Sequence, residues 1–491
     1  MAIELEPIEL SQSINDKIKA TDNGLFLLES GEELTAGDLT TAVAYHRTHF
    51  YPKYKKEHDY YVGRHDITDP TLNPPKEHWK PDNRVVYNFP RKAVTSFNGF
   101  FIGTPVNFSH QDKAVSDEIN NWVANVDLDD VNAEVSKMSS MYGKAYYFIY
   151  QDDETNQDGI YQTLVAPKSP LHTFLIYDAT YKQEVKYGVT YRWRANGDFD
   201  LTLYDAKGYY TYTTSDAEGM FLTSGQGLSH PFGMVPIIEA PENEERMALC
   251  EDIVSLIDEV DKAMSEKSND VDYFSDAYLV LKNTYLNKED LVDIRDNRVI
   301  NISGEGAASA DANFLAKPSA DTTQENLLNR LVDAMYQISN VVNLNDESFA
   351  GNISGVALQM KFQAMQDMAR TKSLKFRKTL RAVLRCVAAA KGYQLDLGGL
   401  DIKFTQSVPH NLTEEASFVN AFYGKIPTPL LYQQLSFIED PNAAFEQLKE
   451  EQRQNALDAS TMLQSAMSEP ENGQSEGVKD NAEPRDGKEA D

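Results

Sequence analysis

The chain has 491 residues, with 46 basic and 76 acidic side chains and a formal net charge of −30. This length predicts several domains with ample core, since domains commonly run about 100 to 200 residues. The charge excludes a protein that coats nucleic acid tightly, because such binding depends on basic side chains that neutralise phosphates.

The cysteine count and the hydropathy limit where the protein can work. Cys250 and Cys386 are the only cysteines, and both fall in predicted helices, which excludes a disulfide framework or zinc ribbon and favours a reducing compartment. No apolar run reaches the about 18 residues of a membrane span, and the Glu-rich N-terminus lacks the basic flank of a signal peptide. We therefore expect a soluble protein, made in the cytosol, with no membrane partner.

The first hundred residues predict an arm followed by helices. Residues 1–35 are polar and weakly patterned, so we expect a partly ordered arm. A helix should run from about Ala36 to about Gly63, and Pro52 should interrupt or kink it because proline has no backbone N–H. Asn88 should open the next helix.

Between residues 144 and 240 the pattern changes to the alternation of short strands rich in Tyr and β-branched residues. Asn196-Gly197 is a strong signal for a two-residue hairpin. We therefore predict an antiparallel sheet flanked by helices, and a multidomain α+β fold. The expected strands are Tyr146–Tyr150, Tyr161–Val165, Phe174–Tyr177, Tyr187–Trp193, Leu201–Tyr204, Tyr209–Thr213 and Val235–Glu239.

Two amphipathic helices are expected to bracket a small mixed segment. The first begins at Pro241, and its face opposite the apolar stripe is acidic. The second covers residues 319–343, and the segment between them should hold strands at 278–281 and 298–302. Periodicity alone leaves open whether the stripes form the core of one subunit or pack between subunits. The stripes consist of Leu249, Ile253, Leu256 and Val260 on the first helix and Leu327, Leu331 and Met335 on the second.

A break rich in Gly and Asn at residues 344–355 separates the second helix from a much longer one. Ser354 should cap this helix, which runs without proline to about Gly392 and so spans about 55 Å at about 1.5 Å per residue. Ordinary globular helices run about 8 to 20 residues. We therefore expect the long helix to cross a subunit boundary or to form a wall.

The long helix is basic although the chain as a whole is acidic, because it has many basic side chains and a single acidic one, Asp367. Like charges at this density repel one another unless something negative lies nearby. Three partners remain open: an acidic face of a neighbouring subunit, DNA phosphate, or solvent. The basic residues are Lys361, Arg370, Lys372, Lys375, Arg377, Lys378, Arg381 and Arg385.

Four strings in the chain resemble phage portal proteins of the SPP1-like (Gp6-like) type, in the order and spacing of that family. One is Tyr-Tyr-x-Gly-x-His-Asp-Ile at 60–67, and another is Phe-x-x-Asn-x-Ser-Gly-x-Ala-Leu at 349–358. The others lie at 83–106 and 256–279. The resemblance covers about residues 36–455 and weakens through the strands and near the C-terminus.

The resemblance implies a division of the chain by the names used for such proteins. The parts are an N-terminal arm (1–35), a wing of helices and antiparallel sheet (36–240), a first stem helix (241–266), a clip (267–318), a second stem helix (319–343), a tunnel loop (344–355), a long helix with a return to the wing (356–407), a helical crown (408–456) and a disordered acidic tail (457–491).

The resemblance also implies a ring, typically of about twelve copies, at one vertex of a tailed-phage capsid. Such a ring nucleates procapsid assembly with the scaffold and major capsid proteins and docks the terminase large subunit and later the head-completion or adaptor proteins. Double-stranded DNA passes through its channel without sequence specificity, and the negative charge suits a conduit that DNA does not stick to. We expect a virion protein assembled in the bacterial cytoplasm that is not an enzyme and has no cofactor.

The resemblance assigns three candidate sites. It places the 344–355 loop in the channel, although the break could equally be an ordinary connector, and it makes the stem stripes a packing surface between subunits. On the long helix it offers Lys361, Arg370, Lys372, Lys375, Arg377 and Lys378 as contacts to DNA or to a neighbour. Asp346 and Glu347 disfavour a grip on DNA, whereas the amides and hydroxyl can form weak hydrogen bonds to phosphate. The loop residues are Asn345, Asp346, Glu347, Ser348, Phe349 and Asn352.

Catalytic and metal-binding motifs are missing from the sequence. His46, His49 and His58 do not have the spacing of a metal site, and there is no P-loop, nucleophile elbow or dinucleotide fingerprint. Two other classes stay open: a non-viral oligomeric scaffold or adaptor, which would form dimers or small bundles, and a DNA-processing enzyme of a mobile element, which would need a metal-ligand set.

Overall fold

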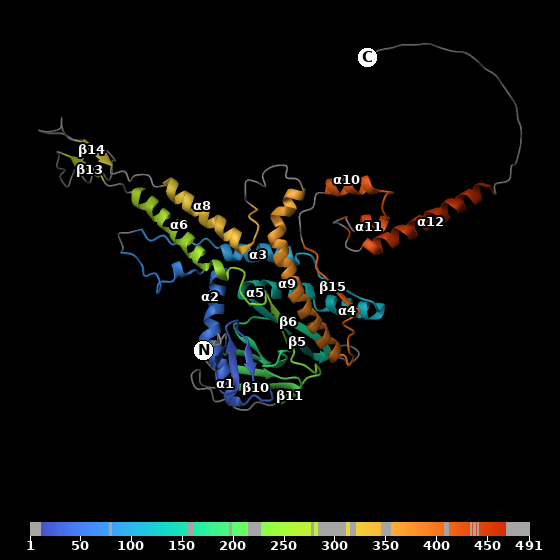
Figure 1. Cartoon of the computed structure of the whole chain (residues 1–491), viewed down its shortest axis with the longest axis horizontal. Helices are drawn as coiled ribbons and strands as arrows, with labels where there is room; N and C mark the ends of the chain where they lie inside the picture. Colours follow the sequence, from blue (N-terminus) through green and yellow to red (C-terminus); the bar gives the residue numbers. More distant parts are fainter. Residues whose placement is uncertain are drawn as a thin grey trace, which may run out of the picture. The chain divides into compact units, whose positions relative to one another are not determined.

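The computed structural model describes residues 11–77, 81–155, 161–195, 199–214, 227–275, 279–282, 311–314, 321–344, 355–406, 412–432, 435, 438 and 441–467. The chain forms two compact units, residues 1–408 and 409–491. The first is a mixture of helices and several sheets, as the predicted α+β class requires (Figure 1).

The first helical run is interrupted where the sequence predicts it. Helix α1 (Ala36–Tyr45) passes into a π-helical turn (His46–Phe50) and then into α2 (Tyr51–Tyr61). The N–H of Tyr51 bonds to the carbonyl of His46, so the turn closes five residues back. Pro52 follows at once, and its ring cannot donate to a carbonyl of the preceding turn.

The predicted strands form, but in two sheets. The larger sheet has eight strands, in the order β1-β2-β3-β7-β8-β9-β10-β11, and the smaller has the order β12-β5-β6. Strand β3 pairs with β7 in parallel, while the other pairs in these sheets are antiparallel. The bounds are β1 (Ser11–Ser13), β2 (Ile18–Thr21), β3 (Phe26–Leu28), β5 (Lys144–Thr155), β6 (Tyr161–Lys168), β7 (Thr173–Asp178), β8 (Val185–Trp193), β9 (Phe199–Tyr204), β10 (Gly208–Thr214), β11 (Gly227–Ser229) and β12 (Ile237–Pro241).

The segment 1–35, which was expected to be a partly ordered arm, forms three short strands over its described part. Strands β1, β2 and β3 extend the larger sheet, and Ile18, Phe26 and Leu28 are buried in its core. Each strand has only three or four residues, which is too short to give a clear alternation. The predicted 196–197 turn lies outside the described residues, although Trp193 pairs with Phe199 across β8 and β9 as a hairpin there requires.

The main core joins the smaller sheet to a set of helices. It includes α3 (Phe89–Ile102), α4 (Lys113–Asn125) and α5 (Leu128–Tyr142), and the side chain of Asn88 accepts from the N–H of Arg91 to cap α3 as predicted. Strand β4 (Asn107–His110) pairs with β15 (Leu400–Lys403), the strand expected after the long helix.

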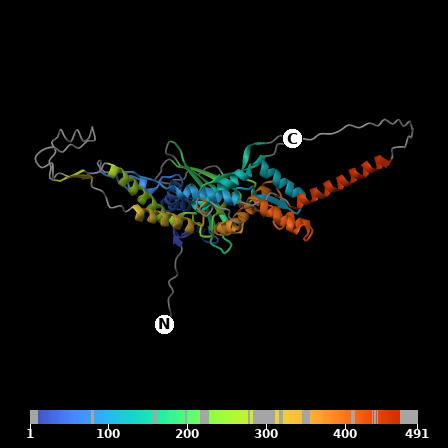
Figure 2. The same ribbon diagram turned by 90° about the horizontal axis from the view of Figure 1, so that it is seen from above.

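Helices α6 (Val254–Ser275) and α8 (Asp321–Ser339) lie side by side, and the hairpin of β13 (Leu279–Lys282) and β14 (Asp311–Phe314) lies beyond them (Figures 1 and 2). The first helix does not begin at Pro241, which instead ends β12 opposite Lys144 of β5. A short 3₁₀ turn (Glu251–Ile253) leads into α6, which continues past the predicted end at 266. The predicted strand at 298–302 lies outside the described residues.

The long helix is α9 (Gly355–Ala390), with 36 residues and therefore a length of about 54 Å. The second unit holds α10 (Leu412–Phe422), α11 (Thr428–Tyr432) and α12 (Pro441–Met467). Helix α12 runs into the segment 457–491 that was expected to be disordered. Its residues 456–467 include Ala456, Leu457, Met462 and Leu463, whose high helix propensity outweighs the polar composition of the rest.

Candidate functional site

The polar face of α6 is a ladder of side chains that binds two other segments of the chain. Asp258, Asp261, Ser265 and Asn269 follow one another at three- and four-residue steps, so they share a face of the helix. The segment 83–87 pairs with no strand in the described part of the chain, and its alternate N–H groups donate to this face instead. The bonds join Asn83 to Asn269 Oδ1 (2.6 Å), Val85 to Ser265 Oγ (2.9 Å) and Tyr87 to Asp261 Oδ1 (2.6 Å).

The second segment on the ladder is the turn after α2. His65 Nδ1 lies 2.5 Å from Asp261 Oδ2, and both side chains are fully buried. The other ring nitrogen, Nε2, lies 3.1 Å from the carbonyl of Tyr60, which can only accept, so Nε2 donates to it. The Tyr60 hydroxyl donates to Asp258 at 2.5 Å, and burial raises the pKa of that carboxyl. The acidic face predicted on this helix therefore fixes α6 to its own subunit.

A buried ion pair fixes the long helix in the same way. Lys372 Nζ lies 2.6 Å from Glu242 Oε2 and also bonds to the carbonyl of Ser136 and to Ser140 Oγ on α5. Glu242 accepts in turn from Ser139 and Ser140. Burial lowers the pKa of Lys372, and Glu242 opposes the shift. With its hydrogen bonds satisfied, Lys372 is not available to DNA or to a neighbouring subunit, which corrects the interpretation of this residue.

Two more of the predicted contact residues find partners within the subunit. Lys375 forms an ion pair with Glu244, and the Nε of Arg377 donates to the carbonyl of Ile402 on β15 at 3.1 Å. For Lys372 and Lys375, the negative partner is thus the segment that follows β12 in the same subunit, which is none of the three partners left open. A sequence pattern shows that a negative partner is needed but not which segment supplies it.

Three other basic side chains of α9 share one exposed face. Among the described residues, Arg370, Lys378 and Arg385 form no ion pair, and all three are exposed. They lie within an arc of about 80°, together with Met360 and Leu374, whose side chains are 69% and 59% exposed. Lys361 is half-buried. This mixed apolar and basic surface is here called the α9 outer face. Of the predicted contact residues, it contains Arg370 and Lys378.

The apolar stripes of the two stem helices mostly pack inside the subunit. Leu249, Ile253, Val260 and Met335 are buried in the main core, and Leu256 and Leu331 are partly buried against it. Only Leu327 is an exposed member, at 46%. The prediction that the buried members form an interface between subunits is therefore wrong. The sequence could not show this, because an apolar stripe has the same period whether its own subunit or a neighbour covers it.

The predicted channel residues Asn345, Asp346, Glu347, Ser348, Phe349 and Asn352 lie outside the described residues. On the described chain, α8 ends at Ser339 and α9 begins at Gly355, as the predicted break between two helices requires.

Reactive groups in the described part of the chain are buried or bonded. Cys250 and Cys386 are buried free thiols, and burial raises the pKa of Cys386 to about 12, which makes it a poor nucleophile. Cys250 lies in a turn before the 3₁₀ segment, and not in a helix. His46 is buried against the Tyr191 hydroxyl at 2.8 Å. No group of three or more His, Cys, Asp or Glu within the described ranges could hold a metal ion, and none of the described helices is long and apolar enough to cross a bilayer.

Comparisons of the sequence with known proteins identify a family for this chain. The family model described as "Phage portal protein, SPP1 Gp6-like" matches residues 41–457. A "Portal protein" of Bacillus phage SPP1 is 23% identical over 404 residues, which cover 77% of this chain and 78% of the relative. A "Portal protein" of Clostridium phage phiCD119 is 21% identical over 422 residues, which cover 80% of this chain and 91% of the relative. Because the family model spans most of the sequence, the chain belongs to the SPP1 Gp6-like family of phage portal proteins.

Proposed function

We propose that this chain is one subunit of a ring, typically of about twelve copies, at one vertex of a tailed-phage capsid. Double-stranded DNA passes through the ring, inward during packaging and outward during ejection. The observation that carries the proposal is the family match over residues 41–457, which includes α6, α8, α9 and the β13/β14 hairpin. Within the ring, α6 and α8 are the stem, the hairpin belongs to the clip, and α10 to α12 belong to the crown.

The partners in this proposal follow from a portal's place in the capsid. The ring nucleates procapsid assembly with the scaffold and major capsid proteins. It then docks the terminase large subunit, which supplies the ATPase, and afterwards the head-completion or adaptor proteins. Because the family is one of phage portal proteins, the proposal makes this chain a virion component, and we place its assembly in the host cytoplasm.

The charge of the chain supports a channel with low friction. A net charge of −30 per subunit repels phosphate, and any basic contact in the channel would be multiplied by the number of subunits. The segment 344–355 lies between α8 and α9, and we place it in the channel wall, where Asp346 and Glu347 keep DNA from binding tightly.

The surfaces left exposed suggest which parts of the subunit meet in the ring. On α8, Leu327 and Ile338 are both 46% exposed and, eleven residues apart, share one face of the helix. On α9, the outer face combines exposed Met360 and Leu374 with basic side chains. We assign these two faces, and not the buried stripes, to the contact between neighbouring subunits. The basic residues of α9 would then meet acidic side chains of the neighbour.

The other two classes of function are less well supported. A non-viral scaffold and a DNA-processing enzyme of a mobile element both leave the family match unexplained, and the enzyme also requires a ligand set that the described residues do not offer.

In vitro packaging tests the proposal. Procapsids assembled with this chain, given terminase and ATP, should protect DNA from nuclease, and procapsids without it should not. Reversing Asp346 and Glu347 to Lys should lower the amount of protected DNA while rings still form. The matched control reverses the exposed pair Glu32 and Glu33. Equal protection without the chain would refute the proposed function, and normal packaging by the loop variant would remove the loop from the mechanism.

A further inference from the structure

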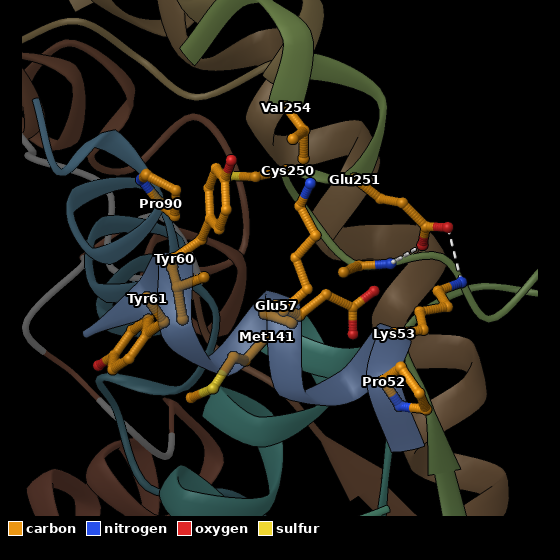
Figure 3. Close-up of a pocket in the computed structure, with 14 residues that line it drawn as sticks. Pro52, Lys53, Glu57, Tyr60, Tyr61, Pro90, Met141, Cys250, Glu251 and Val254 are labelled. Atoms are coloured by element: carbon orange, nitrogen blue, oxygen red, sulfur yellow. Dashed lines mark hydrogen bonds and ion pairs between the residues drawn. The ribbon is translucent and has the colours of Figure 1, made fainter. Parts of the chain in front are cut away.

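A pocket of about 400 Å³ lies between α2, α3, α5 and the turn that leads into α6 (Figure 3). This volume is within the range of small-ligand sites, about 300 to 1,000 Å³. Its walls are mainly apolar, and include Pro52, Pro90, Val94, Met141 and Val254. The pocket does not belong to the stem surfaces or to the α9 outer face.

One acidic side chain in this pocket has no partner. Both carboxylate oxygens of Glu57 are buried, and among the described residues neither has a hydrogen-bond partner. In Figure 3 the dashed lines reach Glu251 but not Glu57. Burial raises the pKa of Glu57 to about 8, while the charge of Lys53 opposes the shift. A buried polar group without a partner is unfavourable, so the pocket lacks the group that would satisfy this carboxyl.

The nearby cations already have other partners. Lys53 lies 2.6 Å from Glu251 Oε1, and Lys56 lies 2.8 Å from Asp66 Oδ2. Lys144 donates to the carbonyl of Gly24 at 2.6 Å. Glu57 is therefore the one acidic lining residue, among those described, whose carboxyl group has no direct partner.

We propose that this pocket binds a lysine side chain presented by a partner polypeptide, with the methylene stem against the apolar walls and the ammonium on Glu57. An ammonium is a compact donor with three N–H groups, which suits one carboxylate between close apolar walls better than a planar guanidinium does. A chain of net charge −30 also attracts a basic protein over a longer range than contact. This proposal does not depend on the ring.

Saturation-transfer NMR on the full-length chain tests the proposal with small probes. N-acetyl-lysine N-methylamide should bind about tenfold more tightly than N-acetyl-norleucine N-methylamide, which has the same apolar stem without the ammonium. Glu57→Gln should remove this difference. Glu259→Gln, which changes an exposed glutamate on α6 by the same charge, should preserve it. Thermal unfolding of both variants checks that they are folded.

Three results would overturn the proposal. The first is equal affinity for the lysine and norleucine probes, or no saturable binding of either. The second is a lysine preference that survives in Glu57→Gln. The third is equal affinity for pentylamine and the lysine probe, which would assign the pocket to a free amine and not to a polypeptide.

Discussion

His65 and Asp261 are 196 residues apart in the chain and form a fully buried pair, with 2.5 Å between Nδ1 and Oδ2. Each belongs to one of the strings that resemble portal proteins, at 60–67 and at 256–279. Tyr87, in the string at 83–106, donates its N–H to the other oxygen of Asp261. Three separate strings thus meet at one carboxylate, which sets the direction in which α6 leaves the core.

Asp261→Asn should destabilise the chain by about 1 to 3 kcal/mol, because it replaces an oxygen of a fully buried hydrogen-bonded pair with an amide group. Chemical unfolding at a fixed protein concentration measures the change. Glu259→Gln, an exposed substitution on the same helix, should change the stability by less than about 0.5 kcal/mol. Equal stability of the two variants would show that the pair does not hold α6 in place.

Lys372 and Glu242 should be energetically coupled. Lys372→Met or Glu242→Gln alone leaves the other member buried without its partner, so each should cost about 3 to 5 kcal/mol. The double variant should cost clearly less than the sum, since neither charge remains. A double-mutant cycle by chemical unfolding measures the coupling, and additive effects would contradict the buried network on α9.

Glu57 makes stability depend on pH. Its pKa is about 8 in the folded chain, against 4.5 as the ordinary value. The folded state therefore binds more protons between these values, and stability falls as pH rises from about 4.5 to about 8 and then levels. Glu57→Gln should lack this decline, so the difference in free energy of unfolding between this variant and the native chain should grow across that window in favour of the variant. Unfolding from pH 5 to 9 measures it, and a constant difference would contradict the burial of the carboxyl.

Leu374→Asp should weaken ring assembly without unfolding the subunit. The side chain is 59% exposed on the α9 outer face, so the change adds a charge to the proposed contact but not to the core. Analytical ultracentrifugation should show a shift to smaller species, with an unchanged circular dichroism spectrum. Leu72→Asp, at a position that is 60% exposed in a loop, is the control. If both variants form rings equally well, the interface lies elsewhere.

The sequence predicts local structure better than it predicts partners. Alternating Tyr and β-branched residues identify β5 to β10, and Asn88 marks the start of α3, because these signals depend on neighbours in the chain. By contrast, Pro241 is compatible with a helix start, and only its pairing with Lys144 shows that it ends a strand.

The candidate site shows the same limit. The spacing of Leu249, Ile253 and Val260 predicts an apolar face, but not that this face packs into the core of the same subunit. Asp261 belongs to a face that the sequence predicts only as acidic, and its partner His65 lies far away in the chain. The Glu57 pocket gives no signal in the sequence, because residues from four segments build it.

Electron microscopy of negatively stained particles tests the central claim most directly. The purified chain, alone and co-expressed with the capsid and scaffold proteins of its phage, is viewed end-on and its rotational symmetry is counted. The account predicts rings of about twelve subunits, with a central channel wide enough for a duplex whose major groove alone is about 12 Å across. Monomers, dimers or particles without a channel in both preparations would contradict it.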